Sequence, residues 1–225
     1  MKFLSKISLL LLLSTAFSCK KNNDNTPPDI FMSFAPGLSW QYRVTDNTPG
    51  GTTTNYTLTS TSRDTLVGSR SYHVFTNSNG NTSEYYNNSG SEYYTYRGLG
   101  GAVTGGTQLE LLYLKSDAPV GTTWSQSFNL TVPNVPLPIP ITVNYTIAEK
   151  GGSRVVNNVT YSNVTRVNSS ISSSLIPATG LTSDIQNYLA PKYGSIESIN
   201  KININFSGVV QNVDTRTFLV TSTIP

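Results

Sequence analysis

The chain has 225 residues, of which only 12% are charged, with 15 Lys and Arg against 12 Asp and Glu. Beyond Lys20 and Lys21 the basic residues form no cluster, so the chain lacks the positive patch by which proteins bind nucleic acid. A single cysteine and a single histidine exclude disulfide frameworks and metal sites built from paired Cys or His. We therefore expect no nucleic-acid partner, no cofactor and no metal.

The first 18 residues have the layout of a secretory signal peptide. Lys2 and Lys6 precede an apolar run at residues 7–13, and small residues follow up to Ser18. As a helix this run is far shorter than the roughly 30 Å hydrocarbon core of a bilayer. We expect the segment to be removed, which leaves 13 basic and 12 acidic side chains.

Cys19 follows this leader directly, and the polar residues 20–28 after it end in two prolines. The stretch Ala-Phe-Ser-Cys at residues 16–19 resembles the lipobox of bacterial lipoproteins, in the looser form found in the Bacteroidetes. The resemblance implies that Cys19 becomes an acylated first residue, that residues 19–33 form a flexible tether, and that acyl chains hold the protein on the outer membrane. Which side of that membrane it faces stays open, and a chance cysteine after an ordinary leader is the alternative.

The composition beyond the tether predicts an all-β fold. Thr, Ser, Asn, Gly, Tyr and Val dominate, and apolar and polar residues alternate at residues 143–147, 202–206 and 218–224. Turn signals at 48–51, 77–81, 87–90 and 150–152 predict antiparallel meanders in a single domain over residues 34–225. We expect at most one short helix, at residues 183–189, capped by Ser183 or Asp184 and ended by Pro191.

An internal repeat indicates two related halves, at residues 34–117 and 118–225. Gly-x-x-Trp at residues 37–40 returns at 121–124, and Asn-Tyr-Thr at 55–57 returns at 144–146. Each half would then contribute a meander led by a tryptophan to one large, strongly curved, half-barrel-like sheet, to a β-sandwich or to two lobes. Coincidence in a composition rich in Tyr and Thr is the alternative.

The repeated Gly-x-x-Trp, the Tyr-rich hairpins and the segment Tyr-Leu-Ala-Pro-Lys-Tyr-Gly-Ser at residues 188–195 resemble lipoproteins of the Bacteroidetes that have no agreed activity. The resemblance implies a strongly curved antiparallel sheet, of the kind that carries lipids or lipoproteins through the periplasm. It brings no catalytic residue.

One predicted hairpin concentrates aromatic and acidic side chains around the turn at residues 87–90. The set is Glu84, Tyr85, Tyr86, Glu92, Tyr93, Tyr94 and Tyr96. We expect each Glu to face a Tyr across the hairpin, because facing carboxylates repel. Tyrosines beside carboxylates suit glycan binding, which requires Tyr86 and Tyr94 to be exposed, and two carboxyl groups about 5 to 9 Å apart would suit a glycosidase. Simple cross-strand packing is the alternative.

Other candidate residues give weaker signals. His73 lies in a predicted strand and no Gly-x-Ser-x-Gly elbow accompanies it, so we expect a structural histidine rather than a member of a catalytic triad. The glycines at residues 98–106 predict a loop, since Thr107 stands where a phosphate loop needs Lys. Asp64-Thr65-Leu66 matches the O-glycosylation pattern of the Bacteroidetes, which makes Thr65 a candidate modification site.

Three functions are compatible with these observations. The preferred one is a membrane-anchored envelope lipoprotein with a non-enzymatic binding or structural role, with a glycan as the candidate ligand. The second is a periplasmic carrier of lipid or another apolar small molecule inside the curved sheet. The third is a hydrolase that uses Glu84 and Glu92.

Overall fold

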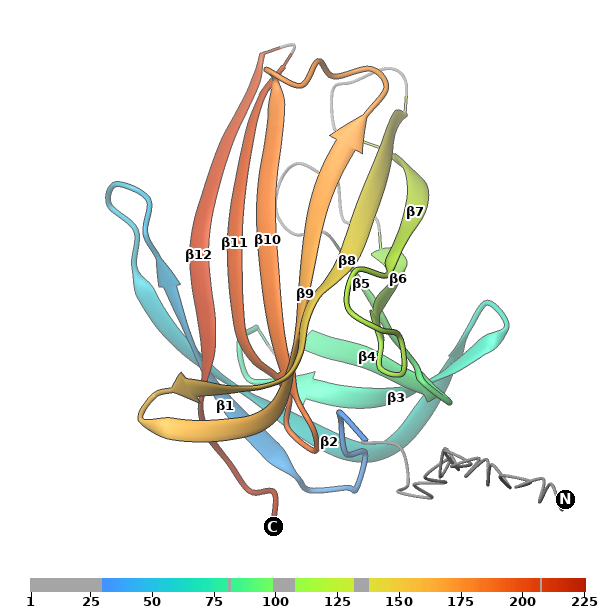
Figure 1. Cartoon of the computed structure of the whole chain (residues 1–225), viewed down its shortest axis with the longest axis vertical. Coiled ribbons are helices and arrows are strands. Elements are labelled where there is room, and N and C mark those ends of the chain that lie inside the picture. Colours follow the sequence, from blue (N-terminus) through green and yellow to red (C-terminus); the bar gives the residue numbers. More distant parts are fainter. Residues whose placement is uncertain (1–29, 81, 99–107, 132–137, 207) are drawn as a thin grey trace, which may run out of the picture.

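The computed structural model describes residues 30–80, 82–98, 108–131, 138–206 and 208–225. Their twelve strands form one antiparallel sheet, in the order β6-β5-β4-β3-β2-β1-β12-β11-β10-β9-β8-β7. The strands are β1 (Ser39–Asp46), β2 (Thr53–Val67), β3 (Arg70–Asn77), β4 (Thr82–Ser89), β5 (Glu92–Gly98), β6 (Gln108–Lys115), β7 (Thr123–Leu130), β8 (Ile139–Val156), β9 (Val159–Ser173), β10 (Leu181–Ala190), β11 (Gly194–Phe206) and β12 (Val209–Ser222). The all-β prediction is confirmed, and the single strongly curved sheet is the arrangement found. Figure 1 shows β8 to β12 side by side as a tall wall, with β3 and β4 across its lower end.

The sheet nearly closes on itself, because its two edge strands β6 and β7 meet at a seam. Side chains join them where the described strands share no backbone ladder. The Gln126 side chain accepts a hydrogen bond from the Leu112 N–H (2.7 Å) and donates one to the Glu110 carbonyl (3.3 Å). The Trp124 indole N–H donates to the Leu112 carbonyl at 2.8 Å. A side-chain amide thus replaces a backbone peptide unit at the seam.

Each half of the chain supplies six consecutive strands, and both halves begin with the same turn. Gly37 and Gly121 adopt φ angles of 85° and 88°, in the left-handed region that glycine enters without a steric penalty. The Gly37 N–H donates to the Ser60 carbonyl and the Gly121 N–H to the Ile147 carbonyl, both at 2.8 Å. The two copies of Gly-x-x-Trp therefore start β1 and β7 in the same way.

The predicted helix at residues 183–189 is wrong, because this segment lies inside β10. Every second residue from Leu181 to Leu189 faces the inner side of the sheet, so the segment follows a two-residue period. Ser183 does not cap a helix. Its hydroxyl accepts from the Ile171 N–H (2.6 Å) and donates to the Ile171 carbonyl (3.3 Å), which extends the contact with β9 beyond the backbone ladder.

The β8–β9 hairpin bends at residues 149–154, where its register shifts repeatedly. We expected a turn at residues 150–152, but the chain turns at Asn157 and Asn158, whose φ angles are 48° and 64°. The hairpin end, residues 149–164, crosses the lower end of the wall in Figure 1. Val156 and Val164 on it are buried in the same core cluster as Trp40.

In the ranges described, no helix has the length and apolar character needed to span a membrane. Within the same ranges, no three side chains of His, Cys, Asp or Glu gather to form a metal site.

Candidate functional site

The β4–β5 hairpin places its glutamates differently from our expectation. The turn lies at Gly90 and Ser91, later than predicted, because Gly90 takes a φ of 65°. Ser89 therefore pairs with Glu92, and Glu84 pairs with Phe75 of β3. The expectation that each Glu faces a Tyr across the hairpin is wrong.

The strand period divides the seven candidate residues between the two faces of the sheet. On the inner face, Tyr93 belongs to one large core cluster and the partly buried Tyr86 packs against the other. Tyr94 belongs to a separate cluster with Tyr72 and Leu112, against which Tyr85 and Tyr96 pack on the outer face. Each glutamate lies on the face of the tyrosine two residues after it, to which it is hydrogen-bonded. Glu84 and Glu92 thus lie on opposite faces and cannot flank one glycosidic bond.

On the inner face, Glu84 lies among buried hydroxyl groups. It accepts from the Tyr86 hydroxyl (2.7 Å) and from the Asn77 side-chain amide (2.6 Å). Burial raises the pKa of Tyr42, Tyr56 and Tyr86, and the charge of Glu84 raises it further. These tyrosines therefore stay neutral in the physiological range. The Tyr42 hydroxyl donates to the Ser195 carbonyl at 2.9 Å, as the Tyr86 hydroxyl does to Glu84.

On the outer face, the polar groups satisfy one another. The Tyr94 hydroxyl donates to Glu92 and lowers its pKa, and the Arg70 guanidinium lies 3.5 Å from the centre of the Tyr94 ring. Arg70 also pairs with Glu110, which accepts from the Tyr72 hydroxyl at 2.5 Å. Tyr94 is only 9% exposed, and Tyr86 is packed in the core, so the exposure that a glycan platform on this hairpin requires is not found.

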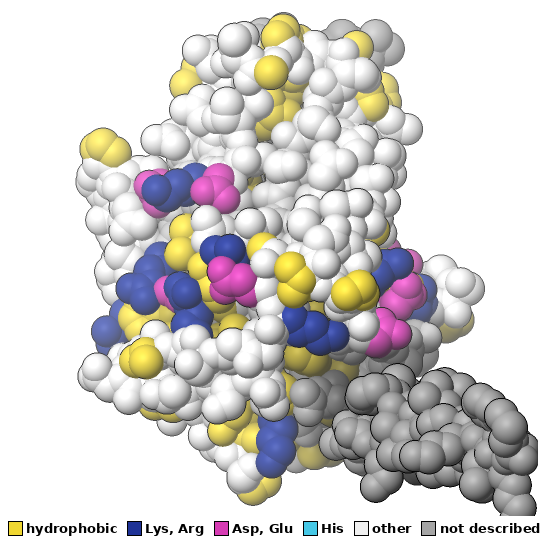
Figure 2. All heavy atoms as spheres, viewed as in Figure 1, with side chains coloured by type: hydrophobic (Ala, Val, Ile, Leu, Met, Phe, Trp, Pro, Cys, Tyr) yellow, Lys and Arg dark blue, Asp and Glu magenta, His cyan; other side chains and the backbone are white. Residues whose placement is uncertain are grey.

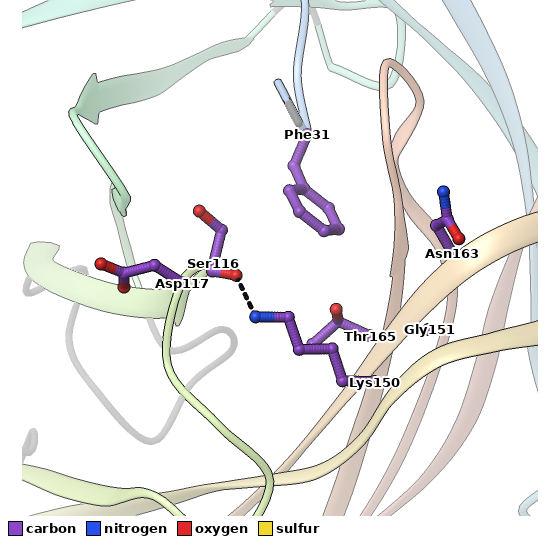
Figure 3. Close-up of a pocket in the computed structure, with 7 residues that line it drawn as sticks. All are labelled: Phe31, Ser116, Asp117, Lys150, Gly151, Asn163 and Thr165. Atoms are coloured by element: carbon purple, nitrogen blue, oxygen red, sulfur yellow. Dashed lines mark hydrogen bonds between the residues drawn. The ribbon is translucent and has the colours of Figure 1, made fainter. Parts of the chain in front are cut away.

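A cavity of about 360 Å³ lies where four distant segments meet, at the lower end of the sheet. Its lining comes from the N-terminal segment, the β6–β7 loop, β8 and β9: Phe31, Ser116, Asp117, Lys150, Gly151, Asn163 and Thr165. Figure 3 shows the Phe31 ring reaching into this space between Ser116 and Asn163, with Lys150 and Thr165 beneath it. The volume lies at the low end of the range for small-molecule sites.

The polar groups of this cavity are only partly used by the protein. Lys150 donates to the carbonyls of Ser116 (2.7 Å) and Ala118 (3.2 Å), and an ammonium group has three donors. The Thr165 hydroxyl is enclosed and has no hydrogen-bond partner within the described ranges. In Figure 3 it points toward Phe31. A buried hydroxyl without a partner costs roughly 1–3 kcal/mol. The described residues therefore leave one costly polar group at this cavity unsatisfied.

His73 has partners that sequence spacing alone did not reveal. Its Nε2 lies 2.9 Å from the Ser60 Oγ, and its Nδ1 lies 2.7 Å from an Asp64 carboxylate oxygen. This is the hydrogen-bond order of a Ser-His-Asp triad. Ser60 is only 2% exposed, however, and its hydroxyl also lies 3.1 Å from the Phe34 carbonyl, so no substrate reaches it in this conformation. A β-bulge between Ser60 and Asp64 brings the three side chains together.

The remaining candidates have varied outcomes. Thr65 lies in β2 opposite Tyr72 and is half-buried, and its modification stays a prediction. Cys19 and most of the glycine-rich loop lie outside the described residues.

We expected the tether to run to residue 33, but Phe31 and Met32 are buried, because these apolar side chains pack into the core. The folded part of the chain therefore begins before residue 34.

Comparison with known proteins supports the fold. One similar crystal structure is that of a "putative lipoprotein" from Parabacteroides distasonis. The alignment covers 87% of this chain and 99% of that protein's chain, at 12% identity and a TM-score of 0.53. A "putative exported protein with YmcC-like fold" from Bacteroides fragilis aligns with 87% of this chain and 100% of its own, at 8% identity and a TM-score of 0.43. No family model and no curated protein matches the chain. The expected resemblance to Bacteroidetes lipoproteins with a curved antiparallel sheet is confirmed at the level of the fold.

Proposed function

We propose that this chain is an exported lipoprotein of the bacterial cell envelope, held on the outer membrane by acylated Cys19, and that it binds a small sugar-like ligand without transforming it. The leader and the lipobox-like stretch support the anchor. The observation that carries the binding role is the cavity beside Phe31, where the Thr165 hydroxyl has no partner among the described residues and Lys150 has a donor to spare.

The chemistry of the cavity favours a polyhydroxylated ligand of about one sugar ring. Asn163 offers an amide that hydrogen-bonds to hydroxyls, and the enclosed Thr165 hydroxyl offers a second group once a ligand displaces the side chains around it. Lys150 adds a positive charge, and Phe31 supplies an apolar surface. The Asp117 carboxylate lies at the rim, on the side away from Asn163 (Figure 3). A sugar that carries a carboxylate would complement Lys150 in particular.

Binding without catalysis is supported by the separation of the acidic groups. Glu84 and Glu92 lie on opposite faces of the sheet, and Ser60 is enclosed. The carrier alternative would require an apolar ligand inside the sheet, which native mass spectrometry of the purified protein would reveal as co-purifying lipid.

We expect Thr165→Val to weaken sugar binding by about tenfold, because valine has nearly the volume of threonine but lacks the hydroxyl. Saturation-transfer NMR of the mature protein with a neutral hexose, a hexuronic acid and an N-acetylhexosamine would measure this. The same substitution should raise the melting temperature of the free protein slightly, since an unpaired buried hydroxyl disappears.

Thr160→Val is the matched control, because Thr160 lies on the same strand but is exposed. It should leave both binding and stability unchanged. If none of the three sugars binds, or if Thr165→Val and Thr160→Val behave alike, the cavity is not the binding site.

We expect Cys19→Ser to release the protein from the membrane fraction, because the serine cannot carry the thioether-linked lipid on which the anchor depends. Fractionation of a Bacteroidetes host followed by intact-mass analysis would measure this. Asn22→Ser, which keeps the thiol, should stay in the membrane fraction. A membrane-bound wild type with an unmodified Cys19 would exclude the lipid anchor.

A further inference from the structure

His73 and Ser60 lie where the N-terminal segment, residues 30–38, attaches to the sheet. The Phe34 ring stacks on the His73 imidazole with a centroid distance of 5.2 Å and an interplanar angle of 10°. The Phe34 carbonyl lies 3.1 Å from the Ser60 hydroxyl, and the Ser60 backbone pairs with Gly37 and Leu38. This contact therefore fixes the end of the segment that precedes β1.

The same segment supplies a wall of the cavity beside Phe31. Phe31 precedes Phe34 by three residues, and its N–H donates to the Tyr93 hydroxyl at 3.1 Å. Met32 forms a β-bridge with Tyr193, and the Ile30 carbonyl accepts from the Lys192 N–H. Movement of residues 30–38 would consequently move Phe31 and change the cavity.

The three polar contacts around His73 need three protons. Nδ1 faces the Asp64 carboxylate, which can only accept, so this nitrogen carries a proton. In neutral imidazole Nε2 is then an acceptor. The Ser60 hydroxyl has one proton, so it can donate either to Nε2 or to the Phe34 carbonyl, and the other contact is left without a hydrogen bond. In imidazolium Nε2 donates to Ser60, and Ser60 donates to Phe34. Only the protonated form makes all three hydrogen bonds.

We propose that the Phe34–Ser60–His73–Asp64 contact is a proton-sensitive attachment of the N-terminal segment, which holds the Phe31 wall of the cavity more firmly as the pH falls. Histidine side chains in general change charge between about pH 5 and pH 8, and this sets the range in which the attachment is tested. As a regulation of the cavity, this inference rests on the proposed binding function. The proton count and the attachment of residues 30–38 are independent of that function.

The charged and titratable groups around His73 come from β2 and β4. From β2 it meets the Asp64 carboxylate, and Arg63 next to that residue is exposed. From β4 it pairs with Tyr86, whose hydroxyl donates to Glu84. Residues 30–38 carry no charge. Of these groups, the Asp64 carboxylate is the one in direct contact with the imidazole.

Hydrogen exchange of the mature lipidated protein in detergent tests the proposal. After correction for the chemical exchange rate, residues 30–38 should be protected about tenfold more at about pH 5.5 than at about pH 8. His73→Gln and Ser60→Ala should each abolish this difference. Thr61→Val is the matched control, because the Thr61 hydroxyl donates to the Val74 carbonyl in the same bulge and has no titrating partner. It should keep the difference.

Equal protection at the two pH values in the wild type, or a difference that survives both His73→Gln and Ser60→Ala, would overturn the attachment. Sugar titrations at the same two pH values separate it from the proposed function. pH-dependent protection without any sugar binding leaves the attachment standing and removes the binding role. If sugar binds with equal affinity at both pH values and the protection does not change, the binding role stands and the proton-sensitive attachment is overturned.

Discussion

We expect Glu197→Gln to lower the free energy of unfolding by about 3 kcal/mol, because it removes the buried charge to which two arginines are bound. The Glu197 side chain is 2% exposed, and it accepts from Arg154 of β8 and from Arg216 of β12, the latter at 2.6 Å. The Arg154 guanidinium also lies 3.3 Å from the centre of the Tyr188 ring. Without the carboxylate the bend of the β8–β9 hairpin loses its ionic attachment to the wall. Figure 2 shows charged side chains gathered in a band across the middle of this face.

Urea denaturation and thermal melting would measure the change, and a loss of about 3 kcal/mol corresponds to a melting temperature about 6–12 °C lower in a domain of this size. We place the loss at the low end for buried pairs because Arg154 and Arg216 are 30% and 48% exposed and stay partly hydrated. Glu149→Gln is the control, since Glu149 pairs with Arg166 but is 60% exposed. It should cost less than about 1 kcal/mol. Equal losses for the two variants would show that burial of Glu197 does not decide its contribution.

The strand content of this fold could be predicted from the sequence, because alternation of apolar and polar residues is a local property. The turn at residues 48–51 was found for the same reason, since Pro and Gly act within a few residues. Residues 183–189 misled the prediction because Ser183, Asp184 and Pro191 are compatible with a capped helix. The neighbouring strands β9 and β11 decide in favour of a strand, and local propensity contains nothing about them.

The candidate sites were harder to predict because they depend on register and on distant segments. A later turn at Gly90 moved the β4–β5 pairing and left Glu84 and Glu92 on opposite faces. The cavity combines residues that lie up to 134 positions apart, from Phe31 to Thr165, and no motif marks them. The partners of His73 lie 9 and 13 residues before it and meet it only because β2 contains a bulge. A β-bulge has no strong sequence signal, so its effect on which side chains meet emerges only from the folded sheet.

The two tryptophans of the repeat should differ strongly when they are truncated, although their sequence contexts match. Trp40 is fully buried and packs 5.7 Å from Phe75, so we expect Trp40→Ala to cost about 4 kcal/mol. Trp124 is half-buried at the seam, where it stacks on Tyr145 at 5.2 Å. Trp124→Ala should cost about 2 kcal/mol, since part of its side chain is in contact with solvent from the start.

Substitution by phenylalanine separates packing from hydrogen bonding at the same two positions. The Trp40 indole N–H has no partner within the described ranges, whereas that of Trp124 donates to the Leu112 carbonyl across the seam. Trp124→Phe should therefore increase hydrogen exchange in β6 and β7, and Trp40→Phe should not. The chain contains two tryptophans, so each single variant reports the fluorescence of the one tryptophan that it keeps. We expect acrylamide to quench Trp124 in the Trp40 variants and to quench Trp40 much less in the Trp124 variants. Equal loss of stability in the two alanine variants would show that burial does not decide what each tryptophan contributes. If Trp124→Phe leaves the exchange of β6 and β7 unchanged, the Trp124 hydrogen bond does not hold the seam together. The near-closure of the sheet would then depend on the two Gln126 hydrogen bonds and on the curvature of the paired strands.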